Sequence, residues 1–165
     1  THPRLTVVHA ATASDLATSV RSEVGHSDAL IMAAAVADFT PISVSDVKIK
    51  KTATTEELVL TLHRTEDILA SVAKSPQRPS ALIGFGAETG SRAQVEHLGS
   101  RKARAKGCDL LAVNQVGNGI GFGDVPNTLV YFDAAGEIVG ETSGSKDQVA
   151  ADLISRVAEL LRKKD

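Results

Sequence analysis

Cysteine, aromatic residues and long apolar runs are all scarce in this chain. Its 165 residues include one cysteine, Cys108, so no internal disulfide can form, and such usage is typical of a reducing compartment. Aromatic residues make up 3% of the chain and tryptophan is absent, which argues against stacking platforms for single-stranded nucleic acid. No apolar run approaches the roughly 20 residues of a membrane span. These absences predict a soluble cytoplasmic protein without a membrane or nucleic-acid partner.

Charge and overall hydropathy are those of an ordinary globular protein. Apolar residues make up 42% of the chain and charged residues 23%. The net charge of −2 argues against a protein that coats nucleic acid, which would be markedly basic. The length predicts a single domain over residues 1–165. The five histidines show no metal-ligand spacing and only one cysteine accompanies them, so no zinc site is expected.

Apolar runs alternate with amphipathic stretches along the chain. Strands are predicted at residues 5–10, 29–37, 58–63, 81–87 and 109–116, and a hairpin at 128–133 and 137–142. Helices are predicted from Ser14 to about Val24, from Thr65 or Asp67 to about Lys74, from Ser91 to Lys106, and from Ser145 onward, with residues 39–51 as a loop. This alternation predicts an α/β fold with a parallel sheet, to which the 58–63 strand and the hairpin add antiparallel strands.

The run MAAAVADFTPISVSDVKIKK, residues 32–51, indicates a nucleotide site. A strand of small residues ends in Asp38, and the lysines Lys48, Lys50 and Lys51 follow about ten residues later. Ligands of open parallel sheets bind beyond the carboxyl ends of the strands. Small side chains leave room for a flat ligand, and lysines can reach a polyphosphate as point charges. A turn-forming Asp38 and a solvated charge run are the alternatives.

Three further features could belong to the same site. Lys102 and Lys106 are four residues apart on a predicted helix, so they share a face, and their repulsion costs a few tenths of a kcal/mol unless an anion lies between them. An exposed basic stripe is the alternative. The segment from Glu66 to Leu69 opens a helix whose amide N–H groups can hold phosphate oxygens. Phe85 lies in a predicted strand, where a phenylalanine is more often part of the core.

Other motifs give weaker evidence of a functional site. The segment GNGIGFG, residues 117–123, fits neither G-x-G-x-x-G nor the P-loop pattern, and we interpret it as a mobile loop over the site. Tyr131 lacks a lysine four residues later, so the tyrosine–lysine pair of short-chain dehydrogenases is absent. Cys108, at a helix–strand junction, is interpreted as structural.

An ordered set of motifs resembles the bacterial phosphopantothenate–cysteine ligase family (phosphopantothenoylcysteine synthetase), the ligase half of the bifunctional coenzyme A biosynthesis protein. The matching pieces are AAAVAD followed by KIKK, residues 66–69, 83–89 and 101–110, Asn114, Gly121-Phe122 and Asn127. The resemblance spans nearly the whole chain and implies a Rossmann-like sheet. In that family a TAGGT-type turn and an NxSSGxxG-type segment precede the strand that matches residues 5–10. Neither occurs here, so we expect that the chain lacks the first βαβ unit and leaves sheet edge and apolar surface uncovered.

The resemblance implies CTP-dependent ligation of 4′-phosphopantothenate with cysteine through an acyl-cytidylate, with release of pyrophosphate and then CMP. Lysines and Mg²⁺ would supply the charge stabilisation. AVAD and KIKK are the bacterial forms and favour CTP over ATP, a choice that sequence physics alone does not make. In the family a flavin-dependent decarboxylase is fused to this half, so FMN belongs to that part and is not expected to bind here.

The resemblance also assigns residues to the site. Lys48, the first lysine of KIKK, would be the catalytic residue that stabilises charge on the α-phosphate. Nucleotide contacts would come from Met32, Ala33, Ala34, Asp38, Lys48, Glu66, Asp67, Ile68, Leu69, Phe85, Lys102 and Lys106. The family has a proline where this chain has Glu66, so a backbone contact is expected at that position. The metal ligands stay unassigned, and the added antiparallel strands imply a homodimer.

Two other classes stay open from the sequence: a non-catalytic module that senses CTP or ATP, and a Rossmann-type dehydrogenase without the usual fingerprint. If the first βαβ unit is absent, we expect the chain to keep most CTP contacts and to be unable to complete the ligation alone.

Overall fold

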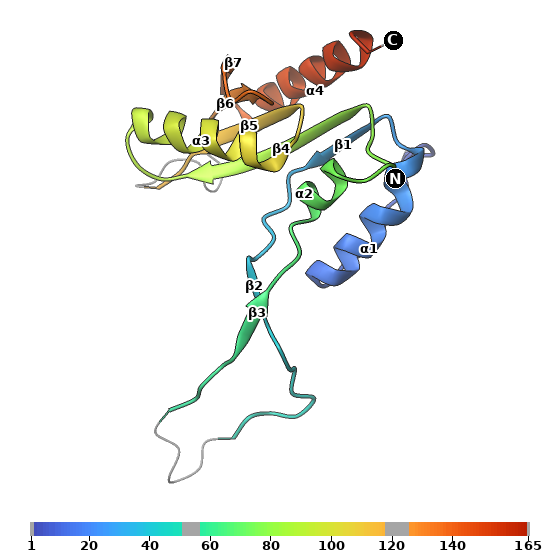
Figure 1. Cartoon of the computed structure of the whole chain (residues 1–165), viewed down its shortest axis with the longest axis vertical. Coiled ribbons are helices and arrows are strands. Elements are labelled where there is room, and N and C mark those ends of the chain that lie inside the picture. The colour runs from blue at the N-terminus through green and yellow to red at the C-terminus, as the bar shows by residue number, and fades with distance from the viewer. Residues whose placement is uncertain (1, 51–56, 118–125, 165) are drawn as a thin grey trace.

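A five-stranded sheet flanked by helices forms the body of the molecule, and a two-stranded ribbon extends from it (Figure 1). The structure is a computed structural model that describes residues 2–50, 57–117 and 126–164. The sheet order is β1 (Ala29–Met32), β4 (Ala81–Glu88), β5 (Leu110–Gln115), β6 (Asn127–Asp133) and β7 (Ile138–Gly144). The first three strands are parallel, and β6 and β7 are antiparallel to their neighbours. The predicted α/β sheet with a late antiparallel hairpin is therefore confirmed.

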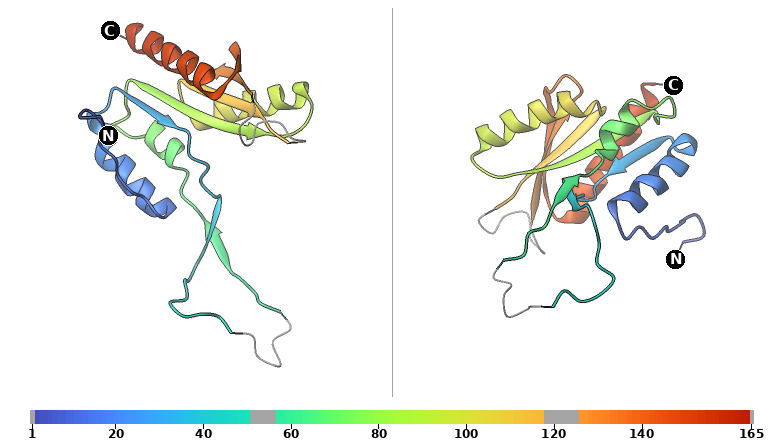
Figure 2. Two further views of the ribbon diagram at one scale, coloured as in Figure 1. Left: turned by 180° about the vertical axis from the view of Figure 1, so that it is seen from behind. Right: turned by 60° about the horizontal axis from the view of Figure 1, so that its bottom comes forward.

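Helices cover both faces of the sheet (Figure 2). The helices α1 (Ala13–Glu23), α2 (Ile68–Ala73) and α3 (Arg92–Lys106), with the short 3₁₀ helix η1 (Val24–His26), contribute to one apolar cluster that includes Leu82 and Leu111. The last helix, α4 (Lys146–Arg162), contributes to a second cluster with Ile83 and Tyr131. Leu82 and Ile83 point to opposite faces because side chains alternate along a strand. Among the described residues, no helix is both long and apolar enough to cross a bilayer.

Capping residues set the ends of the helices. Ser91 and Ser145 cap α3 and α4 in capping boxes with a glutamine three residues later, and Gly107 ends α3 with φ of 67°. These predicted boundaries are confirmed. For α1 the predicted start was wrong by two residues. Thr12 is its cap, because the Thr12 hydroxyl accepts from the Asp15 N–H while the Asp15 carboxylate accepts from the Thr12 N–H.

Two predicted strands of the amino-terminal half were wrong in part or in full. Residues 5–10 form no strand, and Leu5, Val7 and Val8 are exposed. A β-rich run becomes a strand only where its backbone groups find a partner, and the described residues offer this run none. The strand predicted at 29–37 is shorter, since β1 ends at Met32, and it is half-buried at the sheet edge instead of covered on both faces.

A short strand of a separate ribbon forms at residues 39–41, where a loop over 39–51 was predicted, while residues 42–50 contain no helix or strand, as predicted. The strands β2 (Phe39–Pro41) and β3 (Leu62–Arg64) pair antiparallel, with Thr40 opposite His63. The strand predicted at 58–63 is thus shifted toward its carboxyl end, and its antiparallel character is confirmed. Pro41 lies in this ribbon without disrupting it, because an outer strand can accept a residue that donates no hydrogen bond.

A glycine allows α2 to approach the sheet where the candidate site lies. A Cβ atom at Gly84 of β4 would lie 2.5 Å from Leu69 Cδ2 and 3.0 Å from Leu111 Cδ1. The missing side chain therefore leaves the space that Leu69 fills, and α2 packs directly on β4.

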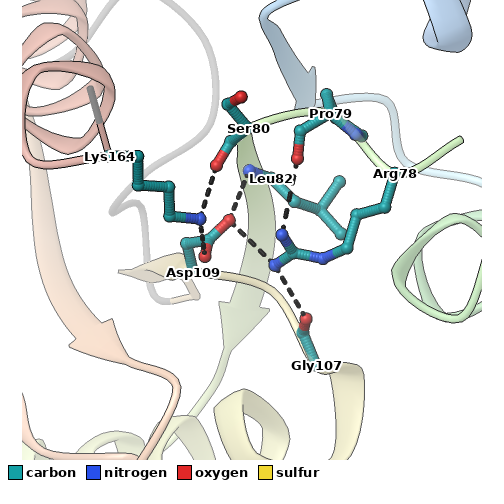
Figure 3. A network of polar contacts seen from close by, with 7 residues as sticks. All are labelled: Arg78, Pro79, Ser80, Leu82, Gly107, Asp109 and Lys164. Atoms are coloured by element: carbon teal, nitrogen blue, oxygen red, sulfur yellow. Dashed lines mark hydrogen bonds and ion pairs between the residues drawn. The ribbon is translucent and has the colours of Figure 1, made fainter. Parts of the chain in front are cut away.

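A polar network ties the end of α4 to the starts of β4 and β5 (Figure 3). The Asp109 carboxylate accepts from the Leu82 N–H at 2.7 Å, from Arg78 Nη2 at 2.9 Å and from Lys164 Nζ at 2.8 Å. Lys164 Nζ also donates to the Ser80 carbonyl at 2.5 Å. Burial raises the pKa of Asp109, but the hydrogen bonds from Lys164, the Leu82 N–H and Arg78 outweigh it and leave that pKa lowered. Asp109 is therefore an ionised structural residue.

Candidate functional site

A cleft of about 690 Å³ opens beyond the carboxyl ends of β1 and β4. Its walls are the chain after β1, the turn that leads into α2, the end of β4 and two lysines of α3. Parallel strands bring their carboxyl ends to one edge of the sheet, where ligands of open α/β sheets bind. The cleft therefore lies where the sequence predicted a site.

The structure brings most of the predicted nucleotide contacts together. Of the twelve predicted residues, all but Ala33 and Lys48 line this cleft: Met32, Ala34, Asp38, Glu66, Asp67, Ile68, Leu69, Phe85, Lys102 and Lys106. Ala33 instead lines a second cleft. Whether any of these residues contacts a nucleotide stays a prediction.

Lys48 lies apart from this cleft. It is exposed and belongs to the segment between β2 and β3, which Figure 1 shows extending away from the sheet. Lys50 lies on the same exposed segment. Lys51, the Gly121-Phe122 pair and most of the glycine-rich loop lie outside the described residues.

Each of the two cleft lysines is paired with a carboxylate. Lys102 Nζ donates to Glu88 Oε1 at 2.5 Å, and Lys106 Nζ donates to Asp67 Oδ2 at 2.5 Å. The lysine side chains retain 35% and 30% of their exposure, so both stay accessible to an anion in the cleft. The repulsion expected between two stacked lysines is thus offset by a separate carboxylate at each one.

Asp67 has two roles at the wall of the cleft. Its Oδ1 accepts from the Ala70 N–H at 3.1 Å and caps α2, while its Oδ2 holds Lys106. Burial raises the pKa of Asp67, but the hydrogen bonds from Lys106 and the Ala70 N–H outweigh it, and the pKa is lowered. Asp67 is therefore ionised at neutral pH. Its carboxylate already accepts from the Ala70 N–H, an amide near the start of α2, where the sequence predicted amides that bind phosphate.

Glu66 is linked to α1. Arg21 Nη1 donates to both carboxylate oxygens of Glu66, each at 2.9 Å, and this hydrogen bonding lowers the Glu66 pKa. Both side chains are about half exposed, so the pair contributes less than about 1 kcal/mol to stability. It links α1 to a residue at the wall of the cleft. Sequence reasoning missed Arg21, because only the tertiary fold brings this helix residue to Glu66.

The end of β4 borders two clefts. Phe85 packs partly against the cluster under α4 and lines both clefts. The second cleft, of about 550 Å³, is mainly apolar, with Asn114, Asn127 and Lys146 as polar members of its wall. Both clefts share residues 34–35 and 85–87, so they meet across the carboxyl end of β4.

The cleft has few side chains that could bind a metal ion. In the described ranges 2–50, 57–117 and 126–164, no three histidine, cysteine or acidic side chains come close enough to form a metal site by themselves. Mg²⁺ usually binds through one or two carboxylates together with substrate phosphates. Asp38 and Asp67 line the cleft and fit that requirement.

This arrangement defines an α/β domain with a cleft, lined in part by two lysines, at the carboxyl edge of its parallel strands. Residues 1–161 match the family described as the DNA/pantothenate metabolism flavoprotein C-terminal domain. The chain belongs to this family, which includes the carboxyl-terminal domain of the coenzyme A biosynthesis bifunctional protein CoaBC.

Curated relatives are similar along most of this chain. CoaBC of Mycobacterium tuberculosis (strain ATCC 25618 / H37Rv) is 37% identical over 161 residues, which are 94% of this chain and 38% of the relative. CoaBC of Bacillus subtilis (strain 168) is 37% identical over 149 residues, 90% of this chain and 35% of the relative. A cysteine/cysteine sulfinic acid decarboxylase from an unknown prokaryotic organism is 36% identical over 135 residues, 81% of this chain and 36% of the relative. The chain thus spans well under half of each relative.

Two solved structures share the fold. The C-terminal domain of CoaBC has a TM-score of 0.71 at 25% identity, covering 99% of this chain and 69% of that one. The DNA/pantothenate metabolism flavoprotein of Streptococcus pneumoniae has a TM-score of 0.73 at 18% identity, covering 96% of this chain and 74% of that one.

Proposed function

We propose that this chain is the CTP-binding part of a phosphopantothenate–cysteine ligase of coenzyme A biosynthesis. The observation that carries the proposal is the convergence of Lys102, Lys106 and Asp38 on one cleft at the carboxyl edge of the sheet. The family match and the CoaBC relatives support the same pathway.

The lining of the cleft suits a nucleoside triphosphate. The small residues 34–37 leave backbone accessible to a flat base, and the two lysines on α3 face the cleft as phosphate ligands. Asp38 and Asp67 would hold Mg²⁺, which supplies charge neutralisation on the polyphosphate when it is bound.

In the proposed reaction a carboxylate oxygen of 4′-phosphopantothenate attacks the α-phosphorus of CTP, and pyrophosphate leaves with the bonding electron pair. The amine of cysteine then attacks the acyl carbon of the acyl-cytidylate, CMP leaves, and the amine loses a proton as the amide forms. Negative charge accumulates on the phosphoryl oxygens in the first step, and positioned lysines stabilise it. Lys48 is proposed for the α-phosphate on the strength of the family resemblance.

A titration with nucleotides tests the proposal. In magnesium buffer we expect the chain to bind CTP more tightly than ATP, and both more tightly than CMP, because CMP lacks the phosphates that the α3 lysines hold. Isothermal calorimetry with CTP, ATP, CMP and NADH provides the measurement. Binding of NADH without CTP would instead support a dehydrogenase, and absence of CTP binding would contradict the proposal.

A turnover assay separates an enzyme from a nucleotide sensor. The assay supplies 4′-phosphopantothenate, cysteine and CTP and measures the release of pyrophosphate. In a longer protein that carries this chain and performs the ligation, Lys48→Gln is expected to abolish pyrophosphate release. A nucleotide sensor would not catalyse the ligation in any form of the protein, so Lys48→Gln would change no rate.

We also propose that the ribbon mediates a homodimer. Large apolar side chains on β2, β3 and the connecting segment are between 49% and 86% exposed: Phe39, Ile42, Val44, Val47, Ile49, Leu58, Val59, Leu60 and Leu62. An apolar surface of this extent is typical of a protein interface. A second copy of the chain can pair its own ribbon with this one through the same residues.

Light scattering during size-exclusion chromatography tests the dimer. We expect the mass of a dimer for the wild type and of a monomer for the Val44→Asp/Val59→Asp variant, because buried charge without a partner opposes association. Ile154→Asp, which changes an exposed apolar residue of α4, serves as the matched control and should remain dimeric. A monomeric wild type would contradict the proposal.

A further inference from the structure

The side chain of Lys102 reaches the cleft across a glycine of β4. A Cβ atom at Gly86 would lie 3.3 Å from Lys102 Cδ and 3.6 Å from Lys102 Nζ. The stem of Lys102 therefore lies against the strand, in space that a larger residue would fill. Lys102 lines the cleft, so its ammonium group stands at the wall of the proposed nucleotide site.

Glu88 receives this ammonium group two residues farther along the same face of β4. Its side chain is only 16% exposed, and it is not among the residues that line the cleft. The backbone at Glu88 is anchored, because Glu88 pairs with Gln115 of β5 and its carbonyl accepts from the Val116 N–H at 2.9 Å. Lys102 thus lines the cleft itself, while its carboxylate partner comes from an anchored strand and does not line it.

The pair formed by Lys106 and Asp67 differs from this arrangement. Asp67 itself lines the cleft, and its side chain is 46% exposed. An anion that enters the cleft meets Asp67 directly and competes with it for Lys106. Glu88 does not line the cleft, so an anion that enters the cleft meets Lys102 without meeting its carboxylate partner.

We propose that Glu88 is a positioning residue that holds Lys102 ready for the polyphosphate of the nucleotide. This inference rests on the proposed function and names a residue that acts on the ligand through Lys102. One of the three N–H donors of the ammonium group binds Glu88, which leaves two donors for phosphate oxygens. A lysine side chain carries about 2 kcal/mol of rotamer entropy, and ordering it before the ligand arrives lowers the cost of binding.

A double-mutant cycle tests this role with the full chain. The variants are Glu88→Gln, Lys102→Met and the combination of both, and the probes are CTP and inorganic tripolyphosphate. Glu88→Gln should weaken both probes about fivefold to tenfold, the range expected for losing the order of one long side chain. In the Lys102→Met background the same substitution should have no further effect, because Glu88 acts through the lysine. A purely structural role would weaken binding in both backgrounds.

Glu141→Gln is the matched control. Glu141 binds Arg92 in a comparable carboxylate pair, and neither residue lines the cleft, so both affinities should match those of the wild type. Thermal melts establish that every variant is folded at the temperature of the titration.

The other outcomes test the positioning role of Glu88 and the proposed function separately. Unchanged or tighter binding by Glu88→Gln overturns the positioning role, and so does an equal loss in the Lys102→Met background. A wild type that binds tripolyphosphate without CTP contradicts the proposed function, while the tripolyphosphate cycle still decides the role of Glu88. A wild type that binds neither probe overturns both.

Discussion

Replacing Lys102 and Lys106 together by alanine is expected to weaken CTP binding about 100-fold to 1,000-fold. Each lysine faces the cleft with about one third of its side chain exposed. A hydrogen bond to a charged group contributes about 1.5–3 kcal/mol. The lower part of this range, about 1.5–2 kcal/mol for each lysine, applies to partly exposed side chains, and two such contacts to phosphate would be lost. The single variants should each lose about tenfold to thirtyfold. Calorimetric titration in magnesium buffer measures these changes.

The choice of ligand gives this prediction a second signature. CMP lacks the β- and γ-phosphates, so its affinity should fall less than that of CTP in the double variant. Lys163→Ala removes an exposed lysine that caps α4 and does not line the cleft, so it should bind CTP like the wild type. Equal losses for CMP and CTP would show that the lysines do not bind the terminal phosphates.

Asp109→Ala is expected to destabilise the fold by about 3 kcal/mol, which corresponds to a melting temperature lower by about 6–12 °C. The substitution removes the acceptor of the buried Leu82 N–H and the partner of both Arg78 and Lys164. An unpaired donor at the start of β4 then bears the full cost of desolvation. Urea denaturation at neutral pH measures the free energy of unfolding.

The contribution of Asp109 depends on pH in a defined direction. Its folded-state pKa is lowered, so its carboxylate stabilises the fold fully above the ordinary aspartate value of about 4. This stability is lost as the pH falls through the lower folded-state pKa, because protonation then favours the unfolded chain. The difference in unfolding free energy between the wild type and Asp109→Asn should therefore shrink in acid.

Asp46→Asn serves as the control for both measurements. Asp46 is exposed on the segment between β2 and β3, away from the Asp109 network, and its substitution should change stability by less than about 0.5 kcal/mol. A difference between wild type and Asp109→Asn that stays constant from neutral to acid pH would contradict the electrostatic role of Asp109.

Several features of the fold were predictable because their causes are local in the chain. Ser91 with Gln94 and Ser145 with Gln148 form capping boxes three residues wide, and Gly107 supplies the left-handed end of α3. The spacing of Lys102 and Lys106 places both on one helix face. The buried strands at 81–87 and 109–116 were recognisable from continuous apolar runs, because both of their faces are covered.

Strand extent in the amino-terminal half was not predictable in this way. The run at residues 5–10 has a strand-like composition without a described partner, whereas Phe39–Pro41 has a proline and still pairs with β3. Pairing depends on backbone groups that lie far apart in the sequence. Composition records only which side chains tolerate a strand.

The sequence by itself determined the boundaries of α3 and the start of α4, the central strands and the residue types that gather at the carboxyl edge of the sheet. Only the tertiary structure decided that Lys102 meets Glu88 across Gly86, that Lys106 meets Asp67, and that the segment carrying Lys48 extends away from the sheet (Figure 1). The physical reason is the separation along the chain over which each interaction acts. Caps and periodicity act within a few residues, while a charge finds its partner only after strands and helices distant in the chain have packed together.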